Sequence, residues 1–139
     1  GQLEFGDAGD LSGLLKEGVK ITAGKLSDNL NIDLADGMVH YFTTQETTTS
    51  TPNIRFSSSA TLDSNMSVGE AISVTLITTA AAAAYSAQLT IDGAAVTENW
   101  VGGSAPSDGG SSGVDIHAYT IIKTGSATFT VIANQSKTS

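Results

Sequence analysis

Few residues in this chain could carry out catalysis. His40 and His117 are the only two histidines, and the chain has no cysteine. A Ser-His-Asp arrangement could be drawn from the many serines, but we expect no Gly-x-Ser-x-Gly elbow that would hold a nucleophilic serine. Both histidines fall in expected strands close to tyrosines, where a packing or surface role is the usual one. The sequence therefore predicts a protein that is not an enzyme.

The acidic residues offer only a weak metal-binding pattern. Oxygen ligands of the kind that calcium prefers occur over Asp63–Asn65, with Glu70 nearby. Their spacing does not match an EF-hand loop, and Asp7 and Asp10 among glycines form a weaker pattern still. We therefore expect neither a metal nor a cofactor.

Trp100 is the only tryptophan, and it precedes a glycine-rich stretch over residues 102–113. Carbohydrate-binding modules use such aromatic rings as stacking platforms, although a single Trp at a strand end more often caps a core. The glycine pairs at 102–103 and 109–110 could suggest a phosphate-binding loop, but no lysine follows them and no helix is expected there. Asn65 and Asn134 fit the glycosylation pattern, which is frequent by chance in a serine-rich chain. Trp100 is thus the one possible ligand or receptor contact that we identify.

The composition indicates one β-rich domain. The 139 residues include 18 Thr, 17 Ser and 15 Gly, and only 14% of them are charged. Threonine fits a pleated strand, whereas serine and glycine favour turns. The formal net charge of −8 disfavours nucleic acid and anionic membranes as partners. No apolar run approaches the roughly 18 residues of a membrane span, so we expect no membrane insertion.

Alternating apolar residues predict six or seven strands in antiparallel succession. The clearest strand covers residues 71–79, and Asp92-Gly93 provides the strongest hairpin turn. A second hairpin is expected at Asp36-Gly37, between residues 32–34 and 38–42. Residues 43–51 are expected as a loop or edge strand, and the five alanines at 80–84 as a loop or one helical turn. This pattern is typical of an antiparallel β-sandwich or jelly-roll-like head over residues 38–139.

Residues 1–37 are expected to form an extended N-terminal arm. Glycines interrupt any helix there, while Val19, Ile21 and Ala23 alternate with polar residues, as do Leu30, Ile32 and Leu34. Isolated extended segments cannot bury enough apolar surface by themselves. They find partners in neighbouring copies by strand addition or intertwining, which leads us to expect a homotrimer.

Residues 53–137 resemble a domain of virion structural and tail-fibre-like proteins of marine tailed phages, including cyanophages. The resemblance is carried by three segments: the hairpin Leu89-Thr-Ile-Asp-Gly, Asn99-Trp100 with residues 102–106, and the ending from Ile121 to Phe129. It implies an exposed, usually oligomeric β-structure on a phage particle and transfers no catalytic residue. A chain of this length is short for a fibre, so a knob or decoration protein is equally compatible.

Two functions follow from these observations as expectations. The first is a virion surface protein whose arm, residues 1–37, attaches it to capsid or tail proteins. The alternative is a secreted or cell-surface carbohydrate-binding module in which Trp100 and the glycine-rich loop contact sugar. A host surface glycan is a possible partner in either case.

Overall fold

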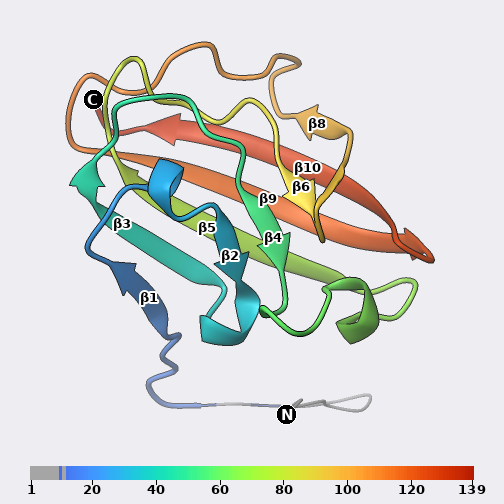
Figure 1. The fold of residues 1–139 in the computed structure, drawn as a ribbon. Helices are drawn as coiled ribbons and strands as arrows, with labels where there is room; N and C mark the ends of the chain where they lie inside the picture. Colours follow the sequence, from blue (N-terminus) through green and yellow to red (C-terminus); the bar gives the residue numbers. More distant parts are fainter. Residues whose placement is uncertain (1–9, 11) are drawn as a thin grey trace.

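The computed structural model describes residue 10 and residues 12–139, and strands dominate it. One sheet has six strands, in the order β1 (Val19–Thr22), β3 (Val39–Gln45), β5 (Ala71–Thr79), β9 (Val114–Gly125), β10 (Thr128–Lys137) and β8 (Glu98–Trp100). The other has four, in the order β2 (Asn31–Asp33), β4 (Asn53–Arg55), β6 (Thr90–Ile91) and β7 (Ala94–Ala95). Three 3-10 helices complete the elements of the described residues: η1 (Leu26–Asp28), η2 (Leu34–Asp36) and η3 (Asp63–Asn65). The expected β-rich fold is confirmed (Figure 1).

The chain passes three times from the large sheet to the small one, and each pass stacks on the one before. The passes are β1 to β2, β3 to β4, and β5 to β6 (Figure 1). Equivalent strands pair in parallel: β1 with β3, β3 with β5, β2 with β4, and β4 with β6. Parallel neighbours need a crossover between them, and here the crossover runs through the opposite sheet. We call these three passes the coils.

Apolar side chains from both sheets form one core between the two layers. The register of the small sheet aligns Ile32, Ile54 and Ile91, which are all buried. Val74, Leu76 and Phe42 face them from the large sheet, since they belong to the same buried cluster. The core therefore joins the coils to one another and the two sheets together.

A polar ladder beside this core keeps the coils in register. The Asn53 side-chain amide donates to the Asn31 Oδ1 atom at 3.0 Å, while its own Oδ1 accepts from Thr90 Oγ1 at 2.7 Å and from the Gly93 backbone N–H at 2.9 Å. Arg55 makes an ion pair with Asp33 of the preceding coil, with Nε and Oδ1 2.6 Å apart. Asn53 thus contacts both of the other coils.

The expected antiparallel arrangement is only partly correct. β9 is antiparallel to β5 and to β10, and β6 is antiparallel to β7 across the Asp92-Gly93 turn, as expected. Asp92 and Gly93 have φ values of 52° and 80°, which this turn requires. The hairpin expected at Asp36-Gly37 is wrong, because residues 34–36 form η2 and the strands on either side belong to different sheets.

The division at residue 37 is not visible in the structure. Residues 19–37 form β1, η1, β2 and η2, and Leu26, Ile32 and Leu34 belong to the common core. Val19 and Ile21, expected on a buried face, are exposed, because they lie on the side of β1 that points away from the small sheet, in register with Val39 and Tyr41 of β3. Residues 12–18 are exposed and have no regular secondary structure. Residues 1–9 and 11 of the expected arm lie outside the described residues.

We expect the Asn53→Ala substitution to lower the free energy of unfolding by about 1–3 kcal/mol, because it leaves the Gly93 N–H and the Thr90 hydroxyl without their acceptor. Urea denaturation followed by circular dichroism measures this change. Asn31→Ala is the matched control, since it removes only the bond to Asn53 at the exposed end of the ladder. Equal losses for the two variants would contradict the central position of Asn53.

Candidate functional site

The inner face of β9 carries most of the buried titratable groups. Asp115, His117, Tyr119 and Lys123 alternate along this strand and all point between the sheets. The Asp115 carboxylate is fully buried, and its Oδ2 atom accepts a hydrogen bond of 2.9 Å from the backbone N–H of Gly110. A carboxylate held by a backbone amide in this way stabilises the loop that precedes the strand.

His117 is enclosed and cannot reach a substrate in the folded chain. Its Nε2 atom lies 3.1 Å from the hydroxyl of Thr78, and both side chains are buried. Burial lowers the pKa of His117 to about 4, so the ring is neutral at pH 7. Burial also raises the pKa of Tyr119. The Nδ1 atom of His117 and the Tyr119 hydroxyl have no hydrogen-bond partner among the residues that the structure describes.

His40 also has a structural role. Its Nε2 atom donates to the carbonyl of Gly37 at 2.9 Å, which fixes the turn between η2 and β3. Burial lowers its pKa as well. The two histidines therefore lie in separate hydrogen-bond networks, and neither is accessible as a base.

The acidic residues considered for calcium bind other groups of the protein. Asp63 makes an ion pair with Lys123 at 2.9 Å and accepts the Ala127 N–H at 2.7 Å. Its hydrogen bond with Lys123 lowers the pKa of Asp63. Glu70 accepts the Ser67 N–H at 2.7 Å. Asp10 is exposed, and Asp7 lies outside the described residues.

No three of the described acidic and histidine residues come close enough together to hold a metal ion. No helix within the described residues is long and apolar enough to cross a membrane.

The glycine-rich stretch is a loop, as expected, but its two glycine pairs differ. Gly102 and Gly103 are exposed with positive φ, whereas Gly109 and Gly110 are buried against the chain near Ala81 and Asp115. Residues 109–113 fit the spacing Gly-x-Ser-x-Gly, a match that sequence inspection missed. Their serine at 111 is exposed and leads into strand β9 rather than into a helix, so it is not a nucleophile elbow.

Trp100 lies half-buried at the end of β8. It packs against the core and also lines a hollow of about 220 Å³. The loop residues 104–108 form one side of this hollow, with Asn134, Gln135 and Lys137 of β10 on the other. Trp100 is therefore both a core cap and an accessible wall beside polar side chains.

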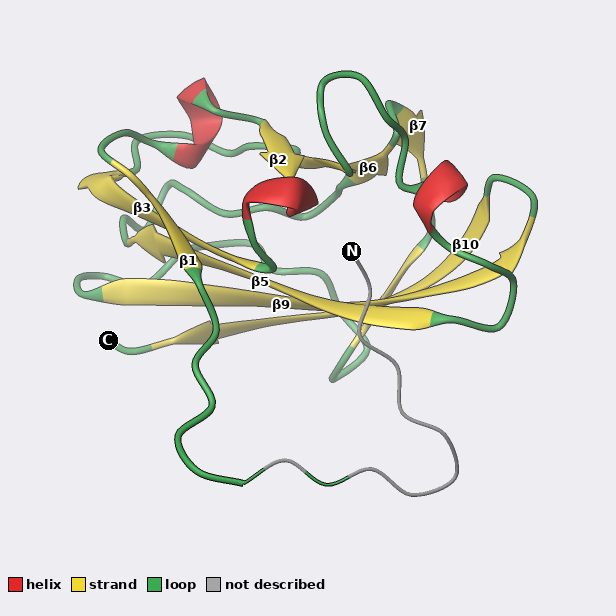
Figure 2. Cartoon of the chain, turned by 90° about the horizontal axis from the view of Figure 1, so that it is seen from below, coloured by secondary structure: helices red, strands yellow, loops and turns green. Residues whose placement is uncertain are grey.

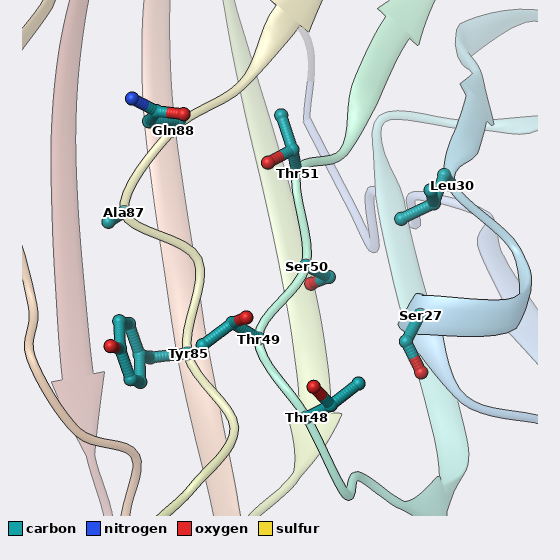
Figure 3. Close-up of a pocket in the computed structure, with 9 residues that line it drawn as sticks. All are labelled: Ser27, Leu30, Thr48, Thr49, Ser50, Thr51, Tyr85, Ala87 and Gln88. Carbon is teal, nitrogen blue, oxygen red and sulfur yellow. The ribbon is translucent and has the colours of Figure 1, made fainter.

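A second hollow lies over the three crossovers between the sheets, and sequence inspection did not find it. It measures about 520 Å³, and its lining comes from η1, from the loop that follows β3, and from the loop that precedes β6 (Figure 3). The lining residues are Ser27, Leu30, Thr48, Thr49, Ser50, Thr51, Tyr85, Ala87 and Gln88. None of them is charged, and most carry a hydroxyl group.

Hydrogen bonds between neighbouring crossovers hold the walls of this hollow. The Ser50 N–H donates to the Tyr85 carbonyl at 3.1 Å, and the Ser50 and Ser86 hydroxyls lie 3.0 Å apart. The buried Glu46 carboxylate accepts the Leu26 N–H at 2.8 Å, and burial raises the pKa of Glu46. The polar threonine-rich loop expected over residues 43–51 thus begins after β3 and stacks between the other two crossovers.

The hollow over the crossovers has the chemistry of a site for neutral polar ligands, whereas the hollow beside Trp100 also contains the Lys137–Asp108 ion pair. Hydroxyl, amide and aromatic groups bind sugars through hydrogen bonds and ring contacts, whereas proton transfer would need an accessible base. Comparisons with known proteins add no identification, because the chain matches no protein-family model, no curated protein and no solved structure.

The low pKa of His117 makes the stability of the fold depend on pH. Below pH 6.5 the unfolded chain binds a proton that the folded chain does not bind until about pH 4, so stability falls as the pH is lowered across this window. Between pH 7 and pH 5 we expect His117 to account for a loss of about 2 kcal/mol in the free energy of unfolding. Urea denaturation at both pH values, compared with His117→Gln, isolates this contribution. Identical pH dependence in the two proteins would contradict it.

Proposed function

We propose that the chain is a non-enzymatic structural protein displayed on the surface of a phage particle, as a fibre, knob or decoration protein. The observation that carries this proposal is the exposure of four aliphatic side chains over residues 14–21. Leu14, Leu15, Val19 and Ile21 are 84%, 65%, 45% and 65% exposed. Apolar side chains gathered on one exposed segment mark a site of contact with another chain.

The position of this segment supports an anchoring role. β1 pairs only with β3, so the backbone groups on its other edge have no partner among the described strands. An unpaired edge strand is a template for strand addition by another chain. We infer that capsid or tail proteins of the particle bind the segment that ends in β1.

The remainder of the chain has the character of a displayed head, which we propose is a β-sandwich. The hollow over the crossovers is lined mostly by hydroxyl groups and contains no charged residue, while the histidines are enclosed in the fold. The resemblance of residues 53–137 to virion proteins of marine tailed phages supports the same location. The head then faces the outside of the virion.

We expect antibodies against the full chain to label the surface of intact phage particles in immuno-electron microscopy. We also expect the double substitution Leu14→Asp, Leu15→Asp to remove the protein from purified particles, because a charged segment cannot bury itself in a partner. Immunoblots of particles produced with each variant measure the incorporated protein.

Val68→Asp is the matched control, since Val68 is 64% exposed and lies outside the anchoring segment. This variant should be incorporated like the unaltered protein. Detection of the chain in infected cells but never in particles would refute the virion proposal.

A carbohydrate-binding module is the second candidate, favoured by the hollow beside Trp100. The indole ring forms one wall, and Asn134, Gln135 and Lys137 provide hydrogen-bonding groups within reach of the same space. A displayed head with this site would bind a glycan of the host surface.

If Trp100 binds sugar, Trp100→Ala should reduce binding on a glycan array at least about tenfold, which corresponds to the loss of roughly 1.4 kcal/mol of ring contact. Tyr85→Ala is the matched variant, since it removes an aromatic ring from the larger hollow. Loss of binding in the Tyr85 variant alone would show that sugar binds in the hollow over the crossovers and not beside Trp100. Absence of binding by the unaltered protein to every glycan would reject this candidate and leave the virion proposal intact.

A further inference from the structure

The outer face of the large sheet is the side that points away from the small sheet. The small sheet and the three 3-10 helices all lie on the opposite side (Figure 2). Asp115, His117, Tyr119 and Lys123 point inward from β9, so the residues that alternate with them, from Val114 to Thr124, belong to the outer face. None of the described strands or 3-10 helices covers it.

A row of large apolar side chains crosses four strands on this face. The register aligns Ile21 of β1 with Tyr41, Ile77 and Ile116 of β3, β5 and β9. Ile21 is 65% exposed, and the other three are half-buried. Rows of this kind normally lie against a core, because aligned side chains on neighbouring strands form a continuous apolar surface.

A hollow lies beside this row on the same face. It measures about 180 Å³ and is lined by Thr75, Ala118 and Thr120, together with Ile132 and Val101. Ile132 is 41% exposed and Val101 is 60% exposed. Ala118 contributes only a methyl group to the middle of the sheet, so an aliphatic side chain from another molecule has space there.

On the described strands, the outer face carries no charged side chain, although the chain has 14 acidic and 6 basic residues. The outward positions of the six described strands hold only aliphatic, tyrosine, hydroxyl and amide side chains. Charged side chains are depleted at the centre of protein interfaces. Two copies that each carry a net charge of −8 repel one another, and an uncharged face brings no carboxylates together.

We propose that the outer face packs against the outer face of a second copy of this chain. The ridge around Ile77 on each copy then fits the hollow around Ala118 on the other, as side chains interdigitate between packed sheets. The six strands, about 4.8 Å apart, set the width of the face, and the nine residues of β5, each rising about 3.3 Å, set its length. The area of the face is then on the order of 700 Å², close to the roughly 800 Å² that each partner buries in a stable interface.

This inference deepens the proposed virion role. It rests on that role, because display on a particle is what brings copies of the chain close together. The contact with the particle is assigned to residues 14–21, whereas the contact between copies is centred on Ile77 and Ala118 in the middle of the large sheet. The two can therefore fail separately.

The test is the molar mass of the full chain in solution, measured by sedimentation equilibrium across the micromolar range. We expect the unaltered chain to form oligomers of the 14.1 kDa unit. Ala118→Glu should weaken association about 100-fold, because it fills the hollow and buries an unpaired carboxylate against the apolar ridge of the other copy. Thr120→Lys is the second variant, which adds a charge of the other sign to the same face.

Ala83→Glu is the matched control, because it adds the same charge at an exposed alanine in a loop away from this face. It should leave the mass unchanged, and circular dichroism should show that all variants remain folded. If the unaltered chain is a monomer, the proposal is overturned. Another protein, or the first residues of the chain, would then be what covers the face. Oligomers that persist in both Ala118→Glu and Thr120→Lys also overturn it. Particle labelling by antibody is independent of either result.

Discussion

The fold depends on keeping three parallel coils in register. Side chains alternate between the two faces of a strand, so a slip of one residue in β4 would turn Ile54 to solvent and Asn53 into the core. Ile54 and Asn53 prevent this together, because the first fills the apolar stack while the second bonds both neighbouring coils. The position of every crossover, and of the hollow built on them, follows from this register.

The alternation of side chains between the two faces of a strand also explains why polar groups are buried on β9. This strand lies between β5 and β10, so half of its side chains point inward whatever their chemistry. Local bonds satisfy most of them: Asp115 accepts the Gly110 N–H, and Lys123 donates to the Met66 carbonyl at 2.8 Å. Such bonds tie the loops before β9 and around η3 to the sheet, and they occupy the groups that catalysis would need.

Local signals predicted local structure well and long-range pairing poorly. The strand at residues 71–79 and the turn at Asp92-Gly93 were predicted, because alternation and turn preference act between neighbours in sequence. The parallel pairing of β3 with β5 joins Val39 to Thr75, and no local pattern indicates it. Of the site residues, Trp100 was found as a lone aromatic. The hollow at Tyr85 was missed because it forms only when three crossovers stack.

β9 also shows why alternation alone does not assign a face to the core. Ile116 alternates with Asp115 and His117, and the apolar residue is the one that points outward. In a sheet with one solvated side, the apolar residues usually face the core and the polar residues face the solvent. The large sheet reverses this arrangement at β9, where apolar residues point outward and titratable residues point inward. Of the inner polar groups, Asp115 and Lys123 are accounted for by their bonds to the loop before β9 and to the segment around η3. The outer row of Ile21, Tyr41, Ile77 and Ile116 has no such account within the described chain, and contact with another copy would give it one.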